Sequence, residues 1–399
     1  MMTPEGCRDV LVIGGGPAGA AAAIELARQG ADVLLVERRS FPRPKVCGGC
    51  LGPRAIACLH HLGVDPAGLD GAVRLDRVQL AVGDARAALP LPIGVAVDRA
   101  KLDLQLLDRA RAAGADVWMQ ARARIGDAVG SGRQVHVERH AAQSTVTAKF
   151  VVLATGLPAA PATAPGARVG LSQTRLVVGV SSAPQRALAS PPSEGGGSPK
   201  SADPPAGDVW MVSGSRGYIG MVRFADGRLN VAASIRASAL GDSSPGARVD
   251  EILVEAGLPA LRWRDGWTGT PPLRAQPPET AEDRVVAVGD AAGFWEPFTG
   301  EGIGWALEAG IAVAPLALEL GSAWDRARAA SWASERRAWM RRIQIRSRTV
   351  AALSGHPRLA RAALGLIRRV PAAGRWLIPA AAPGIDTPGG APGARRGAA

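Results

Sequence analysis

Apolar runs and glycine-rich turns alternate along the first forty residues of the chain. Residues 10–13 form a short apolar run, which predicts a buried strand. A glycine-rich turn follows, and the alanine-rich residues 20–29 predict a helix. A second apolar run, residues 32–36, predicts another strand that ends at Glu37. Strand, turn, helix, strand and terminal acid stand in the order of a dinucleotide-binding unit.

Strand and helix patterns continue along the rest of the chain. Residues 73–91 alternate in short strand-like runs, which predicts the start of a second, substrate-side domain. Two alternating runs, 218–224 and 229–235, flank an Asp-Gly pair, and this pattern favours a hairpin. The other predicted elements are helices around residues 53–62 and 99–106, and strands around 114–117, 150–153 and 284–288.

The glycines of the first turn have the spacing G-x-G-x-x-G, which is typical of dinucleotide binding. The first glycine permits a tight turn, the second lets a diphosphate approach the backbone, and the third lets the helix pack closely on the strand. The N-terminus of the helix offers free N–H groups to the phosphates, and the terminal acid can accept a hydrogen bond from a ribose hydroxyl. An ordinary glycine-rich turn is the alternative. The candidate cofactor-binding residues of this unit are Gly14, Gly16, Pro17, Ala18, Gly19 and Glu37.

Length and composition limit the classes of protein to which the chain can belong. The chain has 399 residues, 47% of them hydrophobic, which is enough for two or three globular domains. The first apolar run is the predicted phosphate-binding strand, so we expect no secretory signal, and four cysteines fit a reducing, cytoplasmic compartment. Residues 303–321 are apolar, but Glu308, Pro315 and Glu319 interrupt them, which favours a buried core helix over a membrane span.

The positive charge lies at the C-terminal end. Residues 322–399 carry fifteen arginines against three carboxylates, so this part accounts for the net charge of +12 and the rest is neutral overall. Trp332, Trp339, Ile343 and Val350 fall near one face of a predicted helix, whose other positions are crowded with arginines. Residues 357–369 form a shorter amphipathic segment. We expect a disordered tail at 380–399 and a flexible insertion at 184–207, since both are rich in Gly, Pro and Ala.

Cysteines cluster after the second predicted strand. Cys47-x-x-Cys50, with Cys58 and His60 nearby, could bind zinc, although the close spacing of the last two residues on a helix counts against it. A redox dithiol beside a flavin is a second interpretation. Buried structural cysteines are a third, and we expect no metal.

Residues 37–51 carry a motif: an acid, a basic residue, then Pro-Arg-x-Lys-x-Cys-Gly-Gly-x-Leu. This motif resembles the geranylgeranyl reductase branch of the FAD-dependent monooxygenase superfamily. The resemblance implies that Arg38 and Gly48 lie along the flavin, and that Cys47 faces the substrate side of the ring as a catalytic residue. Cys50 departs from the family, which usually has a small residue at this position.

A second motif supports the same resemblance. Residues 284–288 predict a strand that delivers Gly289-Asp290, and the carboxylate of this pair binds the ribityl chain of FAD in the superfamily. A helix then begins in a glycine-rich stretch, so its N-terminus is expected to face the flavin pyrimidine edge. The residues implicated in FAD binding here are Gly289, Asp290, Pro297, Gly300, Gly302 and Ile303.

The resemblance covers roughly residues 8–320 and implies further contacts. Arg99 matches an arginine that touches FAD, with a solvated arginine at the start of a helix as the alternative. Ala123 lies where the superfamily often contacts adenine. Gly156, after Thr155, stands where hydroxylases carry an Asp-Gly pair, which weakens the expectation of hydroxylase-type NADPH handling. Tyr218 matches a residue that lines the substrate cavity, with a half-buried strand aromatic as the alternative.

The expected fold is α/β: an FAD-binding Rossmann-like domain, interrupted by a mixed-sheet substrate domain and followed by C-terminal helices. The predicted FAD-binding parts are residues 1–72, 95–165 and 276–321; the substrate-domain parts are 73–94 and 166–275; the basic helices span 322–379 and the tail 380–399.

The expected function is an FAD-dependent oxidoreductase, with NAD(P)H or another reductant as electron donor. The motif around Cys47 favours reduction of a C=C bond in an apolar, polyprenyl-like small molecule. A monooxygenase and an electron-transfer flavoprotein are the alternatives. We expect no nucleic-acid partner. The basic, amphipathic C-terminal segments suit contact with an anionic membrane, and the alternative is that they pack on the body with a solvated face.

Overall fold

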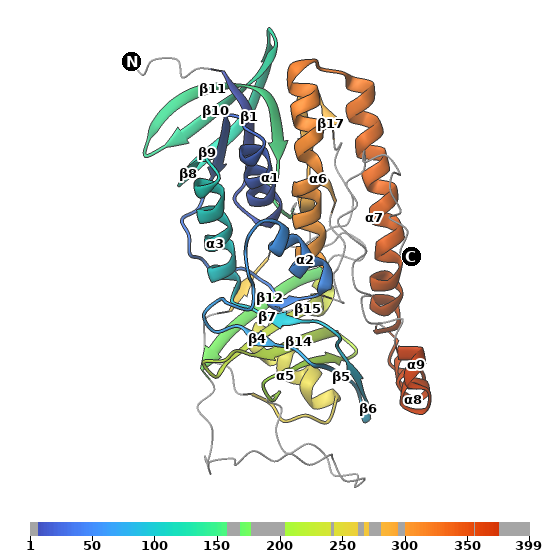
Figure 1. Ribbon diagram of the computed structural model, residues 1–399. Helices are drawn as coiled ribbons and strands as arrows, with labels where there is room; N and C mark the ends of the chain where they lie inside the picture. Colours follow the sequence, from blue (N-terminus) through green and yellow to red (C-terminus); the bar gives the residue numbers. More distant parts are fainter. Residues whose placement is uncertain are drawn as a thin grey trace, which may run out of the picture.

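The computed structural model describes residues 7–157, 168–176, 204–240, 243–261, 267–270, 281–293, 300–354 and 356–374 (Figure 1). Two large sheets lie one above the other in this view. A pair of long helices, α6 (Gly302–Ser322) and α7 (Arg326–Ser354), runs side by side along the upper sheet. The predicted tail 380–399 and residues 184–203 of the predicted insertion lie outside the described residues.

The upper sheet is the expected nucleotide-binding sheet. Its order is β17-β18-β11-β1-β2-β8, with β9 and β10 attached to β11 as an antiparallel extension. Strands β18, β11, β1, β2 and β8 pair in parallel, and helices α1, α3 and α6 cover one face. The bounds are β1 Arg8–Ile13, β2 Val33–Glu37, β8 Asp116–Met119, β9 Ala121–Val129, β10 Gly132–Arg139, β11 Ala142–Leu153, β17 Ala281–Glu282, β18 Val285–Ala287, α1 Pro17–Arg28 and α3 Arg99–Ala112.

Strand β1 is buried on both faces, which explains its continuous apolar run. Val10 and Val12 pack toward α1 and α6, while Leu11 and Ile13 pack on the other face toward β9 and β10. Such two-sided burial is typical of parallel strands.

The lower sheet is antiparallel except for one parallel pair, β13 with β5. Its order is β16-β12-β15-β14-β13-β5-β6, and helix α5 covers one face through Ile252 packed near Ile219 and Val231. The predicted hairpin is confirmed, since β14 and β15 pair around the Asp-Gly turn. The bounds are β5 Arg77–Val82, β6 Ala85–Pro90, β12 Arg168–Leu176, β13 Asp208–Ser213, β14 Gly217–Arg223, β15 Arg228–Arg236, β16 Thr268–Gly269, α4 Ala237–Leu240 and α5 Pro245–Glu255.

Side chains alternate across β14 and β15, which gives the lower sheet two distinct faces. Ile219 and Met221 point to α5, so Tyr218 and Asn230 belong to the opposite face, here called the inner face. Asn230 reaches the Cys47 loop of the upper domain, so the inner face is turned toward that domain. A three-stranded sheet of β3 (Cys50–Leu51), β7 (Val95–Ala96) and β4 (Val73–Arg74) joins the two.

Helix α6 is the buried core helix that the sequence predicts. It is long and apolar enough to cross a membrane, but 78% of its most apolar window is buried inside the protein. Gly310 explains its close approach to α1, because a Cβ there would stand 2.2 Å from the Ala18 carbonyl oxygen.

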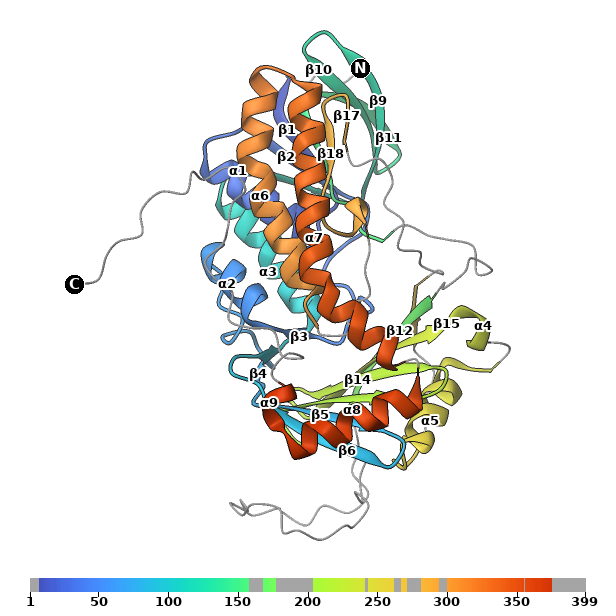
Figure 2. The same cartoon turned by 90° about the vertical axis from the view of Figure 1, so that its right-hand side faces the viewer.

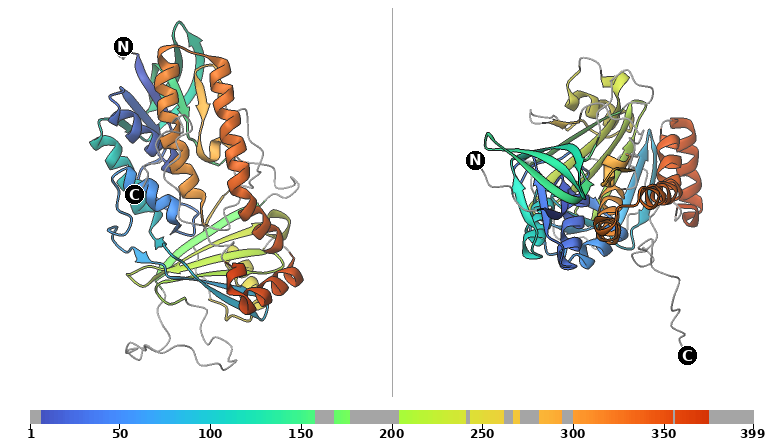
Figure 3. Two further views of the ribbon diagram at one scale, coloured as in Figure 1. Left: turned by 45° about the vertical axis from the view of Figure 1, so that its right-hand side comes forward. Right: turned by 90° about the horizontal axis from the view of Figure 1, so that it is seen from above.

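The C-terminal helices pack on both domains (Figures 2 and 3). Helix α7 crosses from the upper domain toward the lower sheet, and α8 (Pro357–Arg369) lies against β5 and β6, followed by α9 (Pro371–Gly374). Leu364 and Ile367 of α8 are buried against Val82 and Leu89. One apolar face of the amphipathic segment is therefore used in folding.

The last residues of the predicted insertion, 204–207, are held in place by hydrogen bonds, contrary to the expected flexibility. Pro204 is buried and its carbonyl accepts a hydrogen bond from Arg223. The Gly207 carbonyl accepts from the amides of Asp76 and Arg77. Because their backbone groups are paired with the lower sheet, Pro204 to Gly207 form part of that domain.

Candidate active site

The glycine turn has the geometry its spacing predicts. Gly14 has φ +111°, and a Cβ there would meet the Ala154 carbonyl oxygen at 2.3 Å. A Cβ on Gly19 would lie 1.8 Å from the Gly14 carbonyl oxygen, so only glycine lets α1 sit this close to β1. Gly16 faces a more open space, where the nearest atom to its Cβ position is the Lys45 Nζ at 3.5 Å. Pro17 and Ala18 begin α1 beside this space.

Glu37 ends β2 directly beneath the turn. Its buried carboxylate accepts hydrogen bonds from the Gly15 amide and the Arg39 amide, both at 2.8 Å. These bonds fix the carboxylate at the carboxyl end of β2, where ribose recognition is expected. Arg38, the next residue, is exposed. Their contacts with the cofactor remain predictions.

A buried ion cluster lies over the turn, and two of its members, Lys45 and Asp103, are not among the predicted site residues. Asp103 is fully buried, with Lys45 Nζ at 2.6 Å from its Oδ2. Arg99 of the same helix donates from Nε and Nη2 to Asp103 at 3.1–3.2 Å. The four-residue spacing of Arg99 and Asp103 is a sequence signal for this pair.

The cluster keeps its charges by mutual pairing. Burial alone would raise the pKa of Asp103, but Arg99 and Lys45 together hold it below its usual range. Burial would likewise lower the pKa of Arg99, and the neighbouring Asp103 carboxylate and Cys47 sulfur raise it instead. Burial lowers the pKa of Lys45 despite the opposing charge of Asp103. The solvated-arginine alternative for Arg99 is therefore wrong, since its side chain is buried in this cluster.

Cys47 lies between the two domains. Its sulfur accepts from the Gly49 amide at 3.3 Å and stands beside Arg99. Its carbonyl accepts from Asn230 Nδ2 at 3.1 Å, which ties the loop to the inner face of the lower sheet. No atom lies within 4 Å of a Cβ built on Gly48, so the loop borders open space.

Cys50 and Cys58 differ from Cys47 in their surroundings. Burial, with a smaller contribution from Cys47, raises the pKa of the Cys50 thiol to about 12, and the thiol points to the Gly48 carbonyl at 3.6 Å. Burial also raises the pKa of Cys58 to about 12, with Glu308 nearby. All four cysteines are free thiols. Within the described residues, no group of three or more His, Cys, Asp or Glu side chains could hold a metal ion.

Asp290 approaches the turn from the second motif. It lies in η1 (Gly289–Ala292), where Gly289 has φ +62° and would bring a Cβ to 2.8 Å from the Ala18 Cβ. Burial raises the pKa of Asp290 to about 6, although Arg99 and Lys45 act to lower it. Among the described residues, its carboxylate has no hydrogen-bond or ion-pair partner.

The start of α6 is close to the Cys47 loop. A Cβ on Gly300 would lie 3.6 Å from the Cys50 Cβ. Gly302 begins α6, and Ile303 is buried in the core. Pro297 lies outside the described residues.

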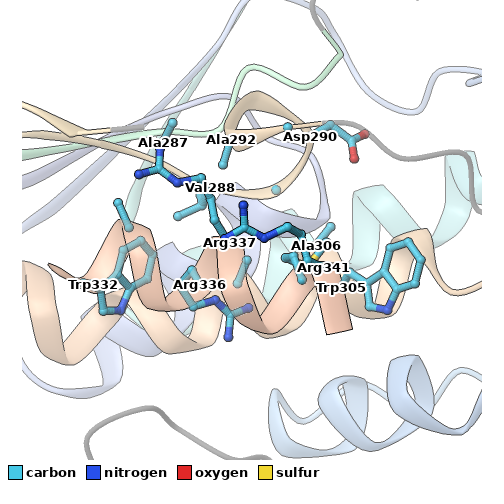
Figure 4. Close-up of a pocket in the computed structure, with 15 residues that line it drawn as sticks. Ala287, Val288, Asp290, Ala292, Trp305, Ala306, Trp332, Arg336, Arg337 and Arg341 are labelled. Carbon is cyan, nitrogen blue, oxygen red and sulfur yellow. The ribbon is translucent and has the colours of Figure 1, made fainter. Parts of the chain in front are cut away.

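These residues fit an FAD molecule. The open space above Gly16, the basic Lys45 beside it and the N-terminus of α1 suit a diphosphate. The Asp290 carboxylate (Figure 4), which has no partner among the residues that the structure describes, suits hydroxyl donors of a ribityl chain. The space next to Gly48 lies between these groups and the lower sheet, where a flavin ring would meet a substrate.

Of three further predicted residues, Gly156 lies beside the glycine turn, since the Cα of the neighbouring Thr155 is 3.3 Å from the Cβ position of Gly14. Gly156 has φ +82° and follows β11, with nothing within 4 Å of its Cβ position. Ala123 lies in β9 and packs against the core on the far side of the upper sheet. Tyr218 is 8% exposed and stands on the inner face, opposite Ser234. No contact of these residues with a cofactor or substrate is established by their positions.

The fold and this constellation define a flavin-dependent oxidoreductase. A model of the FAD binding domain matches residues 8–186. The chain is 30% identical over 341 residues to the menaquinone reductase of Mycolicibacterium smegmatis, covering 77% of this chain and 76% of that protein. It is also 30% identical over 336 residues to digeranylgeranylglycerophospholipid reductase 1 of Methanopyrus kandleri, covering 78% and 80%.

Solved structures show the same fold. A geranylgeranyl bacteriochlorophyll reductase-like protein from Thermoplasma acidophilum superimposes with a TM-score of 0.70 at 18% identity, covering 93% of this chain and 96% of the other. A flavin-dependent brominase gives 0.67 at 17% identity, covering 93% of each. The chain belongs to the geranylgeranyl reductase-like branch of the FAD-dependent oxidoreductases. It is an enzyme, and its cofactor is FAD.

Proposed function

We propose that this enzyme reduces a C=C bond in an apolar, polyprenyl-like small molecule. The observation that carries the proposal is the position of Cys47, held between Arg99 of the upper domain and Asn230 of the inner face. The similarity to a menaquinone reductase and to digeranylgeranylglycerophospholipid reductases supports it. Both kinds of relative are named as reductases.

Reduction of an alkene adds a hydride to one carbon and a proton to the other. Bound reduced FAD supplies hydride chemistry at such a site. The Cys47 thiol holds a proton at the domain boundary, and an ordered water is the other proton source. Loss of the proton leaves a thiolate, which the Gly49 amide at 3.3 Å and the Arg99 guanidinium stabilise. The Cys50 thiol has no arginine beside it that shifts its pKa. It stays protonated, because burial raises its pKa to about 12.

The inner face offers an apolar floor for such a substrate. Met211 and the small Gly220 lie opposite each other on this face, and Tyr218 stands two residues before Gly220 on β14. Because an apolar chain gains free energy by leaving water, this face suits a prenyl chain better than a charged metabolite. Tyr218 is then a substrate-side residue, and the strands of the lower sheet form the substrate domain.

The electrons come from NAD(P)H or another external reductant. Thr155-Gly156 replaces the Asp-Gly pair of hydroxylases, which favours a different mode of donor handling in this enzyme. Anaerobic assays with NADH, NADPH and dithionite separate the donors.

An anaerobic turnover experiment tests the reaction. The reduced holoenzyme is mixed with a polyprenyl phospholipid, a polyprenyl quinone or buffer, and the products are analysed by mass spectrometry. We expect a product that has gained two hydrogen atoms without any oxygen. An oxygenated product that forms only in air makes the enzyme a monooxygenase. Oxidation by an added protein or dye acceptor alone, with both substrates unchanged, makes it an electron carrier.

The two cysteines of the loop provide a matched pair for the mechanism. Cys47→Ser should slow alkene reduction about a hundredfold while FAD stays bound, because it removes a positioned proton donor. Cys50→Ser should leave the rate within about threefold, since its thiol points to the Gly48 carbonyl and stays protonated. Unchanged turnover in Cys47→Ser would reduce Cys47 to a packing residue.

We further propose that the enzyme is cytoplasmic and contacts anionic membranes through α8. Leu359 and Leu366 are both 56% exposed, and Val370, which follows the helix, is 47% exposed. Spacings of seven and four residues place the three on one face. Arg358 and Arg369 border this face and can bind anionic lipid.

Vesicle co-sedimentation tests this contact. Leu366→Glu should weaken binding to phosphatidylserine vesicles several-fold, and added salt should weaken it further. The matched control is Val254→Glu, which replaces another exposed apolar side chain (60% exposed) on α5, a helix that packs on the opposite face of the lower sheet. Equal effects of both substitutions, or no binding by the unmodified enzyme, would remove the membrane from the proposal.

A further inference from the structure

Strand β15 of the lower sheet reaches across to the upper domain at two positions. Arg228 and Asn230 stand two residues apart on this strand, so their side chains leave the same face of the sheet. Asn230 Nδ2 donates to the Cys47 carbonyl at 3.1 Å, and Arg228 Nη2 donates to the Asp98 carboxylate at 3.0 Å. Both hydrogen bonds cross the boundary between the two domains.

The Arg228 contact holds the start of α3. Asp98 is the N-cap of this helix, and its Oδ1 accepts from the Ala100 amide at 2.9 Å while its Oδ2 accepts from Arg228. Arg99 is the next residue, and its guanidinium stands beside the Cys47 sulfur. A shift of Asp98 would therefore move the first turn of α3 and, with it, the cation beside the sulfur.

Arg228 is itself fixed within the lower sheet. Its Nε donates to the Asp226 carboxylate at 2.8 Å, and its guanidinium lies 5.4 Å from the centre of the Phe224 ring. A guanidinium that is held on its own hairpin loses little conformational freedom when it bonds to Asp98, so this contact between the domains is preorganised.

The Asn230 contact holds the loop that carries Cys47. Gly49 of this loop has φ +71°, and a Cβ there would lie 2.7 Å from the Val97 carbonyl oxygen and 3.4 Å from Asn230 Nδ2. The Val97 amide also donates to the Gly49 carbonyl at 2.8 Å. The loop is thus packed between the end of β7 and β15, where Asn230 is 5% exposed. Loss of the Asn230 amide would remove a buried donor that holds the Cys47 main chain.

We propose that Asn230 and Arg228 are positioning residues, which together hold the Cys47 sulfur beside the Arg99 guanidinium. Asn230 fixes the main chain of the cysteine, and Arg228 fixes the helix start that carries the arginine. Because both side chains come from one strand, the lower sheet sets the separation of the pair. The proposal rests on the proposed function, in which Cys47 donates a proton and Arg99 stabilises the thiolate. A displacement of about 1 Å at such a pair can lower a rate about a hundredfold.

Alkylation of the oxidised holoenzyme by iodoacetamide tests the pair without turnover, and tandem mass spectrometry assigns the product to Cys47. The thiolate is the reactive form, so a cation beside the sulfur speeds the reaction at neutral pH. Asn230→Leu has a side chain of similar size without the donor, and should slow alkylation about fivefold. Arg228→Gln should slow it about threefold, because it acts through Asp98. In alkaline solution, where the thiol ionises without help, both variants should react as fast as the unmodified enzyme.

Two substitutions elsewhere control for the loss of an amide or an arginine. Gln79 donates to Asp208 at 3.0 Å, so Gln79→Leu removes a side-chain amide whose bond lies within the lower sheet. Arg74 pairs with Asp76 at 3.2 Å on the surface, so Arg74→Gln removes an exposed guanidinium. Neither control should change the alkylation rate. Asn230→Gln keeps an amide donor and should recover part of the rate, and flavin absorbance verifies that each variant holds FAD.

The anaerobic alkene assay gives the second measurement. Asn230→Leu and Arg228→Gln should lower kcat about tenfold and leave KM within about twofold, because they displace the proton donor and not the substrate. If Asn230→Leu loses FAD, Arg228→Gln decides the question, since its side chain lies at the partly exposed end of the strand.

The alkylation rates and the turnover separate the two proposals. Faster alkylation at neutral pH in the two variants would mean that the loop is only loosened, and would overturn the positioning role. Rates equal to those of the controls would overturn it as well, even where alkene reduction is observed. Slower alkylation in an enzyme that reduces no alkene would support the positioning of Cys47 and refute the proposed reaction alone.

Discussion

Two buried carboxylates, Asp103 and Glu308, each lie between two cations, yet their surroundings differ. Asp103 is fully buried, with Lys45 at 2.6 Å and Arg99 bonded to both oxygens. Glu308 has Arg54 at 2.5 Å, while Arg336 remains 3.9 Å away.

In the second cluster, Arg336 packs closely on an aromatic ring, whereas its contact with the carboxylate is long. The Arg336 guanidinium lies 4.0 Å from the centre of the Trp339 ring, and Arg54 lies 5.4 Å from the same centre. A cation over an aromatic face is stabilised without using its N–H groups. The first network fixes the Lys45 loop above the glycine turn. The second leaves the terminal nitrogens of Arg336 without a hydrogen-bond partner among the described residues.

The largest expected effect comes from removing each carboxylate charge in turn. Asp103→Asn leaves Lys45 and Arg99 buried with one fewer anion, and should lower the free energy of unfolding by about 3–5 kcal/mol. Glu308→Gln should cost about 1–3 kcal/mol, because Arg336 makes little direct use of that carboxylate. Urea denaturation of both variants measures the difference. Equal losses would show that the two clusters are equally closed.

An exposed pair serves as the control for these substitutions. Lys101 and Asp70 pair on the surface, where the Asp70 side chain is 90% exposed. Asp70→Asn removes the same kind of charge without burial, so we expect little change in stability. A loss comparable to that of Asp103→Asn would indicate a general charge effect instead of a buried network.

The closed cluster also sharpens the role of Lys45. Its Nζ stands 3.5 Å from the Cβ position of Gly16, above the phosphate turn. Arg99 alone still bonds both oxygens of Asp103, so Lys45→Met should keep the fold while weakening FAD binding about tenfold. Flavin fluorescence quenching measures the affinity, and Lys101→Met is the control. Unchanged affinity, or loss of the folded state, would contradict this view of Lys45.

The sequence predicts the parts of this molecule that depend on local pattern. The glycine turn, the hairpin of β14 and β15, and the bounds of α8 follow from spacing, turn residues and periodicity. The fold class and the FAD cofactor follow from the two motifs. The roles of the individual site residues stay predictions until a ligand or a variant tests them.

The charge clusters are less predictable because they depend on packing between distant segments. Asp103 looks like an ordinary solvated helix residue, and it is buried only because the Lys45 loop covers α3. Arg336 is one of many arginines in its helix. Its burial depends on Glu308 of the neighbouring helix α6, and the sequence pattern of α7 alone gives no sign of this contact. Asn230 likewise becomes a site residue only when the lower sheet meets the Cys47 loop.

The smallest expected effect concerns Asp290. Among the described residues, this carboxylate forms no ion pair like those of Asp103 and Glu308. Burial raises its pKa to about 6, so in the flavin-free protein it is largely protonated at pH 5 and ionised at pH 7.5. Hydroxyl donors of a ribityl chain favour the ionised form and lower this pKa. FAD binding therefore releases a proton at low pH, and the affinity should fall as pH drops below 6, by about threefold at pH 5.

Titrations of FAD between pH 5 and 8 check this linkage. Asp290→Asn cannot ionise, so its weaker affinity should be nearly independent of pH in this range. Lys45→Met removes a cation that lowers the pKa of Asp290, so its midpoint should move to higher pH. A profile that is flat in the unmodified protein, or equally steep in Asp290→Asn, would place the titrating group elsewhere. Asp290 has no ion-pair partner among the described residues, unlike Asp103 and Glu308, and can therefore act as a pH-dependent contact.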